Sequence, residues 1–310
     1  MSTGEFDWPP RRILVGYDGT DGAKDAVALC AAIAPPDAYV AVVDVLPYPG
    51  APSSAFRLLK GTDFVEPEEY FAPAVTGLPG RRVETISYLG ASPARVFESF
   101  AVENAIDLIV VGSPHHGTLG RVLAGSVSQT LLHGAPVPVA TAPHGYADRA
   151  DGALGTVAVA YDGGEESQAA LAYAGALVES AGARLDVLTV ERPTAPVSGA
   201  IAYTFALPQD TDDIQRQALE EVDPSIPLRR RVLHGQTADV LADACHDGVD
   251  LIVVGSRGYG TVERVLLGST STALIHESPC PVLVVPRPAE HLGPQEPTAE
   301  GEGSAFPRSP

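Results

Sequence analysis

The chain has 310 residues, which fits one large domain or two domains of medium size. Hydrophobic residues make up 45% of it and charged residues 19%, a composition that can bury a core. The formal net charge of −19 argues against nonspecific binding to nucleic acid or to anionic membranes. A small anionic ligand is compatible with this charge, because backbone amides and helix N-termini can hold a phosphate without cationic side chains.

Cysteine usage and hydropathy both bear on where the protein resides. The three cysteines, Cys30, Cys245 and Cys280, are widely spaced and form neither a CxxC pair nor a disulfide framework. The first residues, MSTGEFDWPPRR, lack the apolar core of a signal peptide, and no apolar run approaches the ~20 residues of a membrane helix. We therefore expect a cytoplasmic protein with no membrane partner and no nucleic-acid partner.

Short apolar runs alternate with helical patterns through the first half of the chain. Ser92 is expected to cap one helix, with Pro93 in its first turn. Residues 47–80 are rich in Pro, Gly and Ser, and the only element predicted there is a short helix at 54–60. The periodicity predicts strands at 13–17, 39–46, 83–89, 107–111 and 136–142, and helices at 25–33, 93–104 and 126–133.

The second half shows the same succession of elements. Thr237 is expected to cap one of its helices. The periodicity predicts strands at 156–161, 184–190, 229–233, 251–254 and 282–285, and helices at 168–180, 212–222 and 237–246, with a last helix starting at Ser269.

A nearly constant offset relates the two halves. Asp18 recurs 144 positions later as Asp162, whereas Gly112, Gly125 and Pro136 recur 143 positions later as Gly255, Gly268 and Pro279. An offset that holds over the whole unit indicates a tandem duplication. We expect a first domain over residues 1–146, a second over 152–288, and a disordered tail over 289–310, where little can be buried.

Strands that alternate with helices predict a parallel sheet covered on both faces. The fold class is therefore α/β, with two tandem doubly wound, Rossmann-like domains of five strands each. In such sheets ligands bind beyond the carboxyl ends of the strands, near the switch in strand order. Asp18 and Gly112 would meet at that edge in the first domain, and Asp162 and Gly255 would meet in the second.

The most informative stretch is residues 250–269, DLIVVGSRGYGTVERVLLGS, which has a weaker copy at residues 107–126. Glycines at a strand end and Gly-Ser at a helix start can present backbone N–H groups to a phosphate. Each piece also has a structural explanation. The glycines can serve turns, the serine can cap a helix, and Asp162-Gly163 is a common turn pair.

These residues resemble the universal stress protein family, and the resemblance covers nearly all of residues 12–287. The nucleotide-binding branch of the family carries G-x2-G-x9-G-[ST] after its fourth strand. The second half matches at every position, with Gly255, Gly258, Gly268 and Ser269. The first half matches at Gly112, Gly125 and Ser126, but His115 replaces the second glycine. The Asp-Gly pair after the first strand and PCPVLVV at the end strengthen the resemblance.

The resemblance implies a doubly wound sheet, dimerisation through the last strand and, in one branch, binding of ATP, which we expect together with Mg²⁺. In the second domain Asp162 would contact the ribose and Val190 the adenine. The phosphates would be held there by Gly255, Gly258, Gly268, Ser269 and the backbone at Thr270. The matching residues of the first domain are Asp18, Val45, Gly112, Gly125 and Ser126.

His115 makes the first site different. Either the loop is rearranged and binds poorly, or the imidazole itself donates to a phosphate. Metal binding by the protein alone is not expected, because His115 and His116 are adjacent and no third ligand is evident. No catalytic triad and no Walker lysine can be identified, so we do not expect an enzyme.

The leading hypothesis is an ATP-binding regulatory protein of the stress response. One alternative is a nucleotide-free interaction protein, in which the last strands, 136–142 and 279–285, pair with each other as an intramolecular pseudo-dimer. A slow ATPase is the other alternative. A homodimer of two chains remains open in each case.

Overall fold

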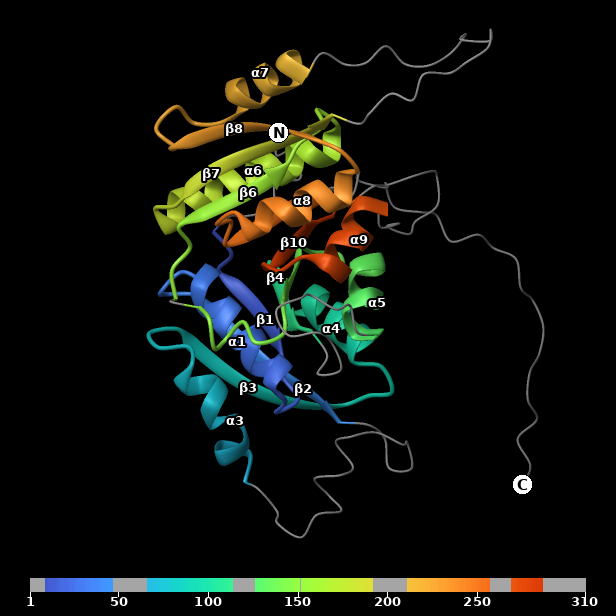
Figure 1. Cartoon of the computed structure of the whole chain (residues 1–310). Coiled ribbons are helices and arrows are strands. Elements are labelled where there is room, and N and C mark those ends of the chain that lie inside the picture. The colour runs from blue at the N-terminus through green and yellow to red at the C-terminus, as the bar shows by residue number, and fades with distance from the viewer. Residues whose placement is uncertain are drawn as a thin grey trace, which may run out of the picture.

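The structure is a computed structural model that describes residues 9–46, 66–113, 126–150, 152–191, 211–256 and 269–286. Its strands form one ten-stranded sheet in the order β3-β2-β1-β4-β5-β10-β9-β6-β7-β8, with helices on both faces (Figure 1). Within each half the strands are parallel and follow the order third, second, first, fourth, fifth. This order confirms the prediction of two tandem doubly wound five-stranded units.

The two halves contain matching elements. The first half consists of β1 (Arg12–Gly16), α1 (Asp21–Ile33), β2 (Tyr39–Leu46), α3 (Pro67–Thr76), β3 (Arg82–Leu89), α4 (Pro93–Glu103), β4 (Leu108–Gly112), α5 (Ser126–Gly134) and β5 (Val139–Ala142). The second consists of β6 (Thr156–Ala160), α6 (Glu165–Ala181), β7 (Arg184–Glu191), α7 (Thr211–Glu221), β8 (Leu228–His234), α8 (Thr237–His246), β9 (Leu251–Gly255), α9 (Ser269–Glu277) and β10 (Val282–Val285). All ten predicted strands are present.

Helix α3 was not predicted and lies in the stretch expected to be irregular. Its start carries good helix signals, with Pro67 in the first turn and two glutamates after it. Pro73 lies inside the helix, where proline normally removes a hydrogen bond. Because proline is unusual inside a helix, the sequence pattern did not indicate a helix here. The helix predicted at 54–60 lies outside the described residues.

Several predicted boundaries and one predicted cap were wrong. Helices α1 and α6 begin at Asp21 and Glu165, four and three residues before the predicted starts. Ser92 is the N-cap of α4 with Pro93 in the first turn, as predicted, although the Ser92 side chain makes no capping hydrogen bond. Thr237 is the first residue of α8, and Gln236 is its N-cap. Strand β5 begins only at Val139, after two prolines, which have no N–H to donate to a ladder.

The two halves are joined by β5 and β10, which pair antiparallel at Thr141–Val282, Ala140–Leu283 and Val139–Val284. Every residue of both strands is buried. Since all other pairs in the described sheet are parallel, the strands of one half run opposite to those of the other. The carboxyl ends of the two halves therefore lie at opposite edges of the sheet.

Apolar side chains form one cluster on each face of the sheet. One face is covered by α1, α3, α6 and α7, which contribute Leu29, Phe71, Leu171 and Ala218, respectively. The other face is covered by α4, α5, α8 and α9, which contribute Phe97, Leu131, Leu241 and Leu274, respectively. The strands are apolar on both sides because both sides are covered.

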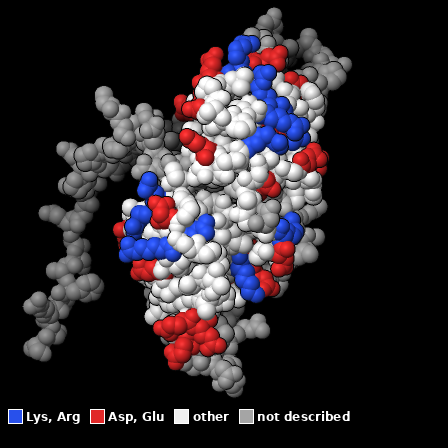
Figure 2. Space-filling view, turned by 90° about the vertical axis from the view of Figure 1, so that its left-hand side faces the viewer, with Lys and Arg blue, Asp and Glu red and all other residues white. Residues whose placement is uncertain are grey.

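On the face in Figure 2, Lys and Arg lie beside Asp and Glu in several places, and one group at the lower end of the view is acidic only. Three arginines lie near Asp186, which is buried in β7. Arg184 Nε lies 3.0 Å from its carboxylate, Arg231 Nη1 lies 3.9 Å away and Arg229 Nη1 4.0 Å away. Two of these three arginines, Arg229 and Arg231, lie in the edge strand β8. Part of the basic character of β8 therefore serves to pair the buried carboxylate of Asp186.

The aspartates that open the two DLIVVG segments have the same structural role. Asp107 accepts hydrogen bonds from the backbone N–H groups of Arg11 and Arg12, both at 2.8 Å. Asp250 accepts them from Gly155 and Thr156, at 2.9 and 2.8 Å. Each carboxylate thus fixes the start of its unit's first strand beside the fourth strand.

The first glycine of each motif is required by packing. A Cβ on Gly112 would lie 1.8 Å from the carbonyl oxygen of Gly22 in α1, and a Cβ on Gly255 would lie 2.5 Å from that of Glu166 in α6. No real Cβ tolerates such contacts with backbone atoms. The end of the fourth strand therefore abuts the first turn of the unit's first helix.

We predict that Gly112→Ala lowers the free energy of unfolding by about 3 kcal/mol, because either β4 or α1 must move. Gly175→Ala is the matched control, since its Cβ would meet only Ile226 Cδ1, at 3.9 Å. That control lies inside α6, where alanine is favoured over glycine, so it should stabilise by about 0.5–1 kcal/mol. Urea unfolding of the three proteins provides the measurement. A wild-type midpoint for Gly112→Ala would contradict the packing argument.

Candidate functional site

Parallel pairing brings the predicted strand-end residues together. Strand β1 lies between β2 and β4, and β6 lies between β7 and β9. One edge therefore collects Asp18, Val45 and Gly112, and the opposite edge collects Asp162, Val190 and Gly255.

The remaining predicted residues follow the fourth strands. Ser126 and Ser269 are the first residues of α5 and α9, and Thr270 is the second residue of α9. Their side chains lie outside what the structure describes. Gly125, Gly258, Gly268 and His115 also fall outside the described residues.

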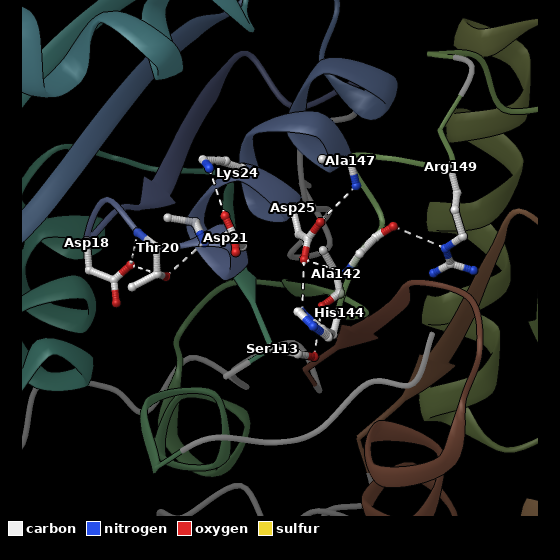
Figure 3. Close-up of polar contacts among 12 residues, drawn as sticks. Asp18, Thr20, Asp21, Lys24, Asp25, Ser113, Ala142, His144, Ala147 and Arg149 are labelled. Atoms are coloured by element: carbon white, nitrogen blue, oxygen red, sulfur yellow. Dashed lines mark hydrogen bonds and ion pairs between the residues drawn. The ribbon is translucent and has the colours of Figure 1, made fainter. Parts of the chain in front are cut away.

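Asp18 and Asp162 both shape the turn that follows the first strand of their unit. Asp18 Oδ1 accepts hydrogen bonds from the backbone N and Oγ1 of Thr20, at 3.1 and 2.5 Å, and Thr20 caps α1 (Figure 3). Asp162 Oδ1 accepts one from Gly164 N at 3.1 Å. The glycines after them have φ near 74° and 80°, a left-handed conformation that glycine adopts without strain. Both Asp-Gly pairs therefore act as turn residues, which is the structural explanation given above for Asp162-Gly163. Asp18 and Asp162 are nevertheless exposed.

The two units differ at the end of the second strand. Val45 and Val190 are half-buried and contact the core beneath α4 and α8. The residue before each valine faces the opposite side of the sheet and is buried. It is Asp44 in the first unit and Thr189 in the second. Asp44 was not among the residues predicted from the sequence, although a lone carboxylate within the apolar run VAVVDVL is a detectable signal.

Asp44 lies in a cluster of acidic and aromatic groups. Burial is the main reason why the pKa of Asp44 is raised to about 6, and the charge of Asp18 contributes to the same increase. Hydrogen bonds from the Tyr70 hydroxyl and the Val45 backbone partly offset this increase in pKa. Burial and the two carboxylates in turn raise the pKa of Tyr70.

Helix α3 supplies the aromatic part of this cluster. The Tyr70 ring is edge-on to Tyr17, with ring centroids 5.4 Å apart, and the Tyr17 hydroxyl donates to the Tyr70 carbonyl oxygen at 3.3 Å. Tyr70 Cε2 would lie 3.0 Å from a Cβ on Gly19, in the turn after β1. Tyr70 therefore covers the strand ends of the first unit.

The second unit has an uncharged arrangement at the same place. Thr189 Oγ1 accepts a hydrogen bond from Gln215 Nε2 of α7 at 2.5 Å. Gln215 is buried, and its Oε1 has no hydrogen-bond partner among the described residues. Ile214 lies beside the turn glycine, Gly163, at 3.8 Å from the position of its Cβ. The second unit therefore has no carboxylate at this strand position and instead holds a buried acceptor, Gln215 Oε1.

The segment between the two units is held on α1. Asp25, buried in that helix, accepts hydrogen bonds from the backbone N–H groups of Gly145 and Ala147, both at 2.8 Å (Figure 3). A cavity of about 360 Å³ lies between this segment, α1 and α3 and is lined by Tyr17, Lys24 and mostly apolar groups. None of the predicted nucleotide-binding residues lines this cavity, so we do not place the nucleotide there.

The pKa of Asp44 generates a prediction about stability. A carboxyl group whose pKa is higher in the folded than in the unfolded chain stabilises the fold at low pH, and this contribution is lost as pH rises through about 6. Asp44→Asn should therefore stabilise the protein at pH 8 by about 2 kcal/mol and reduce the gain in stability between pH 7 and pH 5. Urea unfolding at pH 5, 7 and 8 gives both quantities. Asp239→Asn, at an exposed position of α8, is the control, and an unchanged pH profile in Asp44→Asn would refute the effect.

Comparison with known proteins bears on the origin of this architecture. The model of the universal stress protein family matches residues 10–143 and again residues 154–286. The chain belongs to the universal stress protein family. Universal stress proteins are in general not enzymes. Among the described residues, no helix has both the length and the apolar character needed to cross a membrane.

Individual relatives show the same relationship. A universal stress protein of Thermus aquaticus is 34% identical over 133 residues, which are 42% of this chain and 97% of that protein. One from Mycobacterium tuberculosis is 32% identical over 193 residues, covering 59% of this chain and 63% of the relative, which is just under two thirds of its length. A solved universal stress protein structure from Archaeoglobus fulgidus has a TM-score of 0.65 at 20% identity and covers 93% of this chain and 99% of its own. That likeness supports the fold.

Proposed function

We propose that this universal stress protein is a nucleotide-binding regulator of the stress response and that its second unit binds ATP with Mg²⁺. The observation that carries the proposal is the difference between the two second-strand ends. In the first unit the buried Asp44 lies near enough to Asp18 for the two charges to interact, whereas the second unit has the uncharged Thr189 at the matching position. A polyanionic nucleotide is repelled by an additional carboxylate that is poorly screened by water. The unit with the intact glycine motif is thus also the one without a buried carboxylate at this strand position.

The helix that follows β9 can supply the phosphate donors. Ser271, in the first turn of α9, donates a hydrogen bond from Oγ to the Gly255 carbonyl oxygen at 3.1 Å and so holds the start of α9 at the strand end. The first turn of α9 carries no acidic residue, whereas that of α6 carries Glu165 and Glu166. A helix N-terminus without acidic side chains favours an anion. We therefore assign the phosphates to α9 and the glycine loop.

The sugar and the base would lie nearer β6 and β7. Asp162 is an exposed carboxylate at a strand end and can accept hydrogen bonds from ribose hydroxyls. Val190 offers a half-buried apolar side chain to a base at the end of β7. Adenine has an apolar face, so Val190 and Asp162 together are compatible with an adenine nucleotide.

The test uses the matched aspartates of the two units. We expect wild-type protein to bind one ATP per chain in the presence of Mg²⁺, and Asp162→Ala to weaken binding at least about tenfold, because a charge-assisted hydrogen bond contributes about 1.5–3 kcal/mol. Asp18→Ala disrupts the equivalent turn and should leave the affinity unchanged. Isothermal titration calorimetry measures stoichiometry and affinity together. Absence of binding at millimolar ATP would refute the proposal, and equal losses in both variants would refute the assignment to the second unit.

The nucleotide-free alternative is supported by the pairing of β5 with β10, which already gives the chain an internal interface. Because this pair occupies both fifth strands, a dimer of two chains would need another surface. Heat-denaturing the purified protein and measuring nucleotide absorbance in the supernatant separates the two proposals. A slow ATPase would require turnover that disappears in Asp162→Ala.

A further inference from the structure

Two cysteines that are distant in sequence meet in the second unit. Cys245 lies near the end of α8, and Cys280 lies just before β10. The Ser278 hydroxyl lies 3.6 Å from the sulfur of Cys245 and 3.5 Å from that of Cys280. The two residues are 7% and 6% exposed. Both thiols are therefore held against one serine, just beneath the surface.

The surroundings favour charge on only one of the two sulfurs. A hydrogen bond from the Cys280 thiol lowers the pKa of Cys245; burial opposes this effect, and Ser278 and the Arg231 guanidinium reinforce it. Burial raises the pKa of Cys280, as does its interaction with Cys245. A lowered pKa makes the Cys245 thiolate easier to form, and a thiolate next to a second thiol is the reactive species in disulfide formation.

The chain contains internal comparisons for this pair. Cys30 is fully buried in α1, and burial raises its pKa to about 12. The first unit has Val137 at the position that matches Cys280, and Ala135 at the position that matches Ser278. The thiol pair with its shared serine is thus a feature of the second unit alone.

We propose that Cys245 and Cys280 are a peroxide-sensitive pair that forms a disulfide in the native protein. The Cys245 thiolate attacks one oxygen of hydrogen peroxide and breaks the O–O bond, which gives a sulfenic acid and a hydroxide that takes up a proton to become water. Cys280 sulfur then attacks the sulfenic sulfur and displaces a second hydroxide, which the Cys280 proton converts to water. Two thiols are oxidised by two electrons, and one peroxide is reduced to two waters.

Cys245 and Cys280 flank the proposed nucleotide site in the sequence, so a disulfide between them should affect that site. The ring closed between residues 245 and 280 contains β9, α9 and every residue of the G-x2-G-x9-G-S motif. A covalent link between its ends restricts how far α8 and the start of β10 can separate. We therefore expect oxidation to change ATP affinity at least threefold, a consequence that rests on the function proposed above.

The first experiment does not depend on ATP. The reduced full-length protein is treated with hydrogen peroxide at pH 7, unfolded, alkylated with N-ethylmaleimide and digested for mass spectrometry. We expect a cross-linked peptide pair containing Cys245 and Cys280, two hydrogens lighter than the separate peptides and cleaved by dithiothreitol, with Cys30 fully alkylated. Full alkylation of Cys245 and Cys280, or their separate oxidation to sulfinic acids, would overturn the proposal.

A variant tests the order of the two steps. In Cys280→Val, which introduces the residue of the first unit, Cys245 should stop at the sulfenic acid and react with dimedone. Absence of dimedone labelling in this variant, when it is folded by circular dichroism, would overturn the assignment of Cys245 as the attacking sulfur. Cys30→Ser should form the disulfide at the wild-type rate, and a slower rate would show that Cys30 takes part.

Calorimetry of the reduced and oxidised proteins with ATP and Mg²⁺ completes the test. A threefold or larger change in affinity supports regulation of the nucleotide site by the disulfide, whereas equal affinities overturn that regulation. If neither form binds ATP, the proposed nucleotide function fails, and the disulfide is still decided by the mass spectra.

Discussion

The antiparallel pairing of β5 with β10 is the contact on which the architecture depends. Without it, each unit would be a five-stranded sheet with its buried fifth strand exposed as an edge, a surface prone to association. The pairing also fixes the relative direction of the two units. Because their strands run in opposite directions, the two sets of strand ends lie at opposite edges of one sheet. The candidate sites cannot share residues, so any difference between them must arise within each unit.

The two units differ most at the end of their second strands, β2 and β7. Both units have the same turn after the first strand, and both place a glycine against the first helix. They differ in the side chain that faces α3 or α7. Asp44 requires the Tyr70 hydroxyl, and Tyr70 then covers the turn at Gly19, whereas Thr189 requires only an amide from Gln215. The pair of residues in this buried contact thus determines both the charge and the covering of a strand end.

The sequence was sufficient for the order of the strands, because a strand buried on both faces is a short apolar run such as LIVVG and the two copies support each other. It was insufficient where tertiary contacts override local preference. Helix α3 forms despite Pro73 because Phe71 and Ala74 are buried on the core. The contact between Tyr70 and Asp44 joins two segments across a stretch with weak local signals, so no spacing rule could reveal it. Thr237 and Ser92 show that residue type alone does not determine which side chain caps a helix.

The packing of Gly112 and Gly255 changes how the glycine motif should be interpreted. Each is excluded from carrying a side chain by a backbone carbonyl of its own unit, and this constraint is the same in the unit with the intact motif and in the unit with His115. The first glycine is therefore expected in any member of this fold, whether or not it binds a nucleotide. Discrimination between ligand-binding and other members must come from positions at which the two units differ, such as Gly258 against His115 in the sequence and Thr189 against Asp44 in the structure. Evidence for a ligand is strongest where the fold itself does not already require the residue.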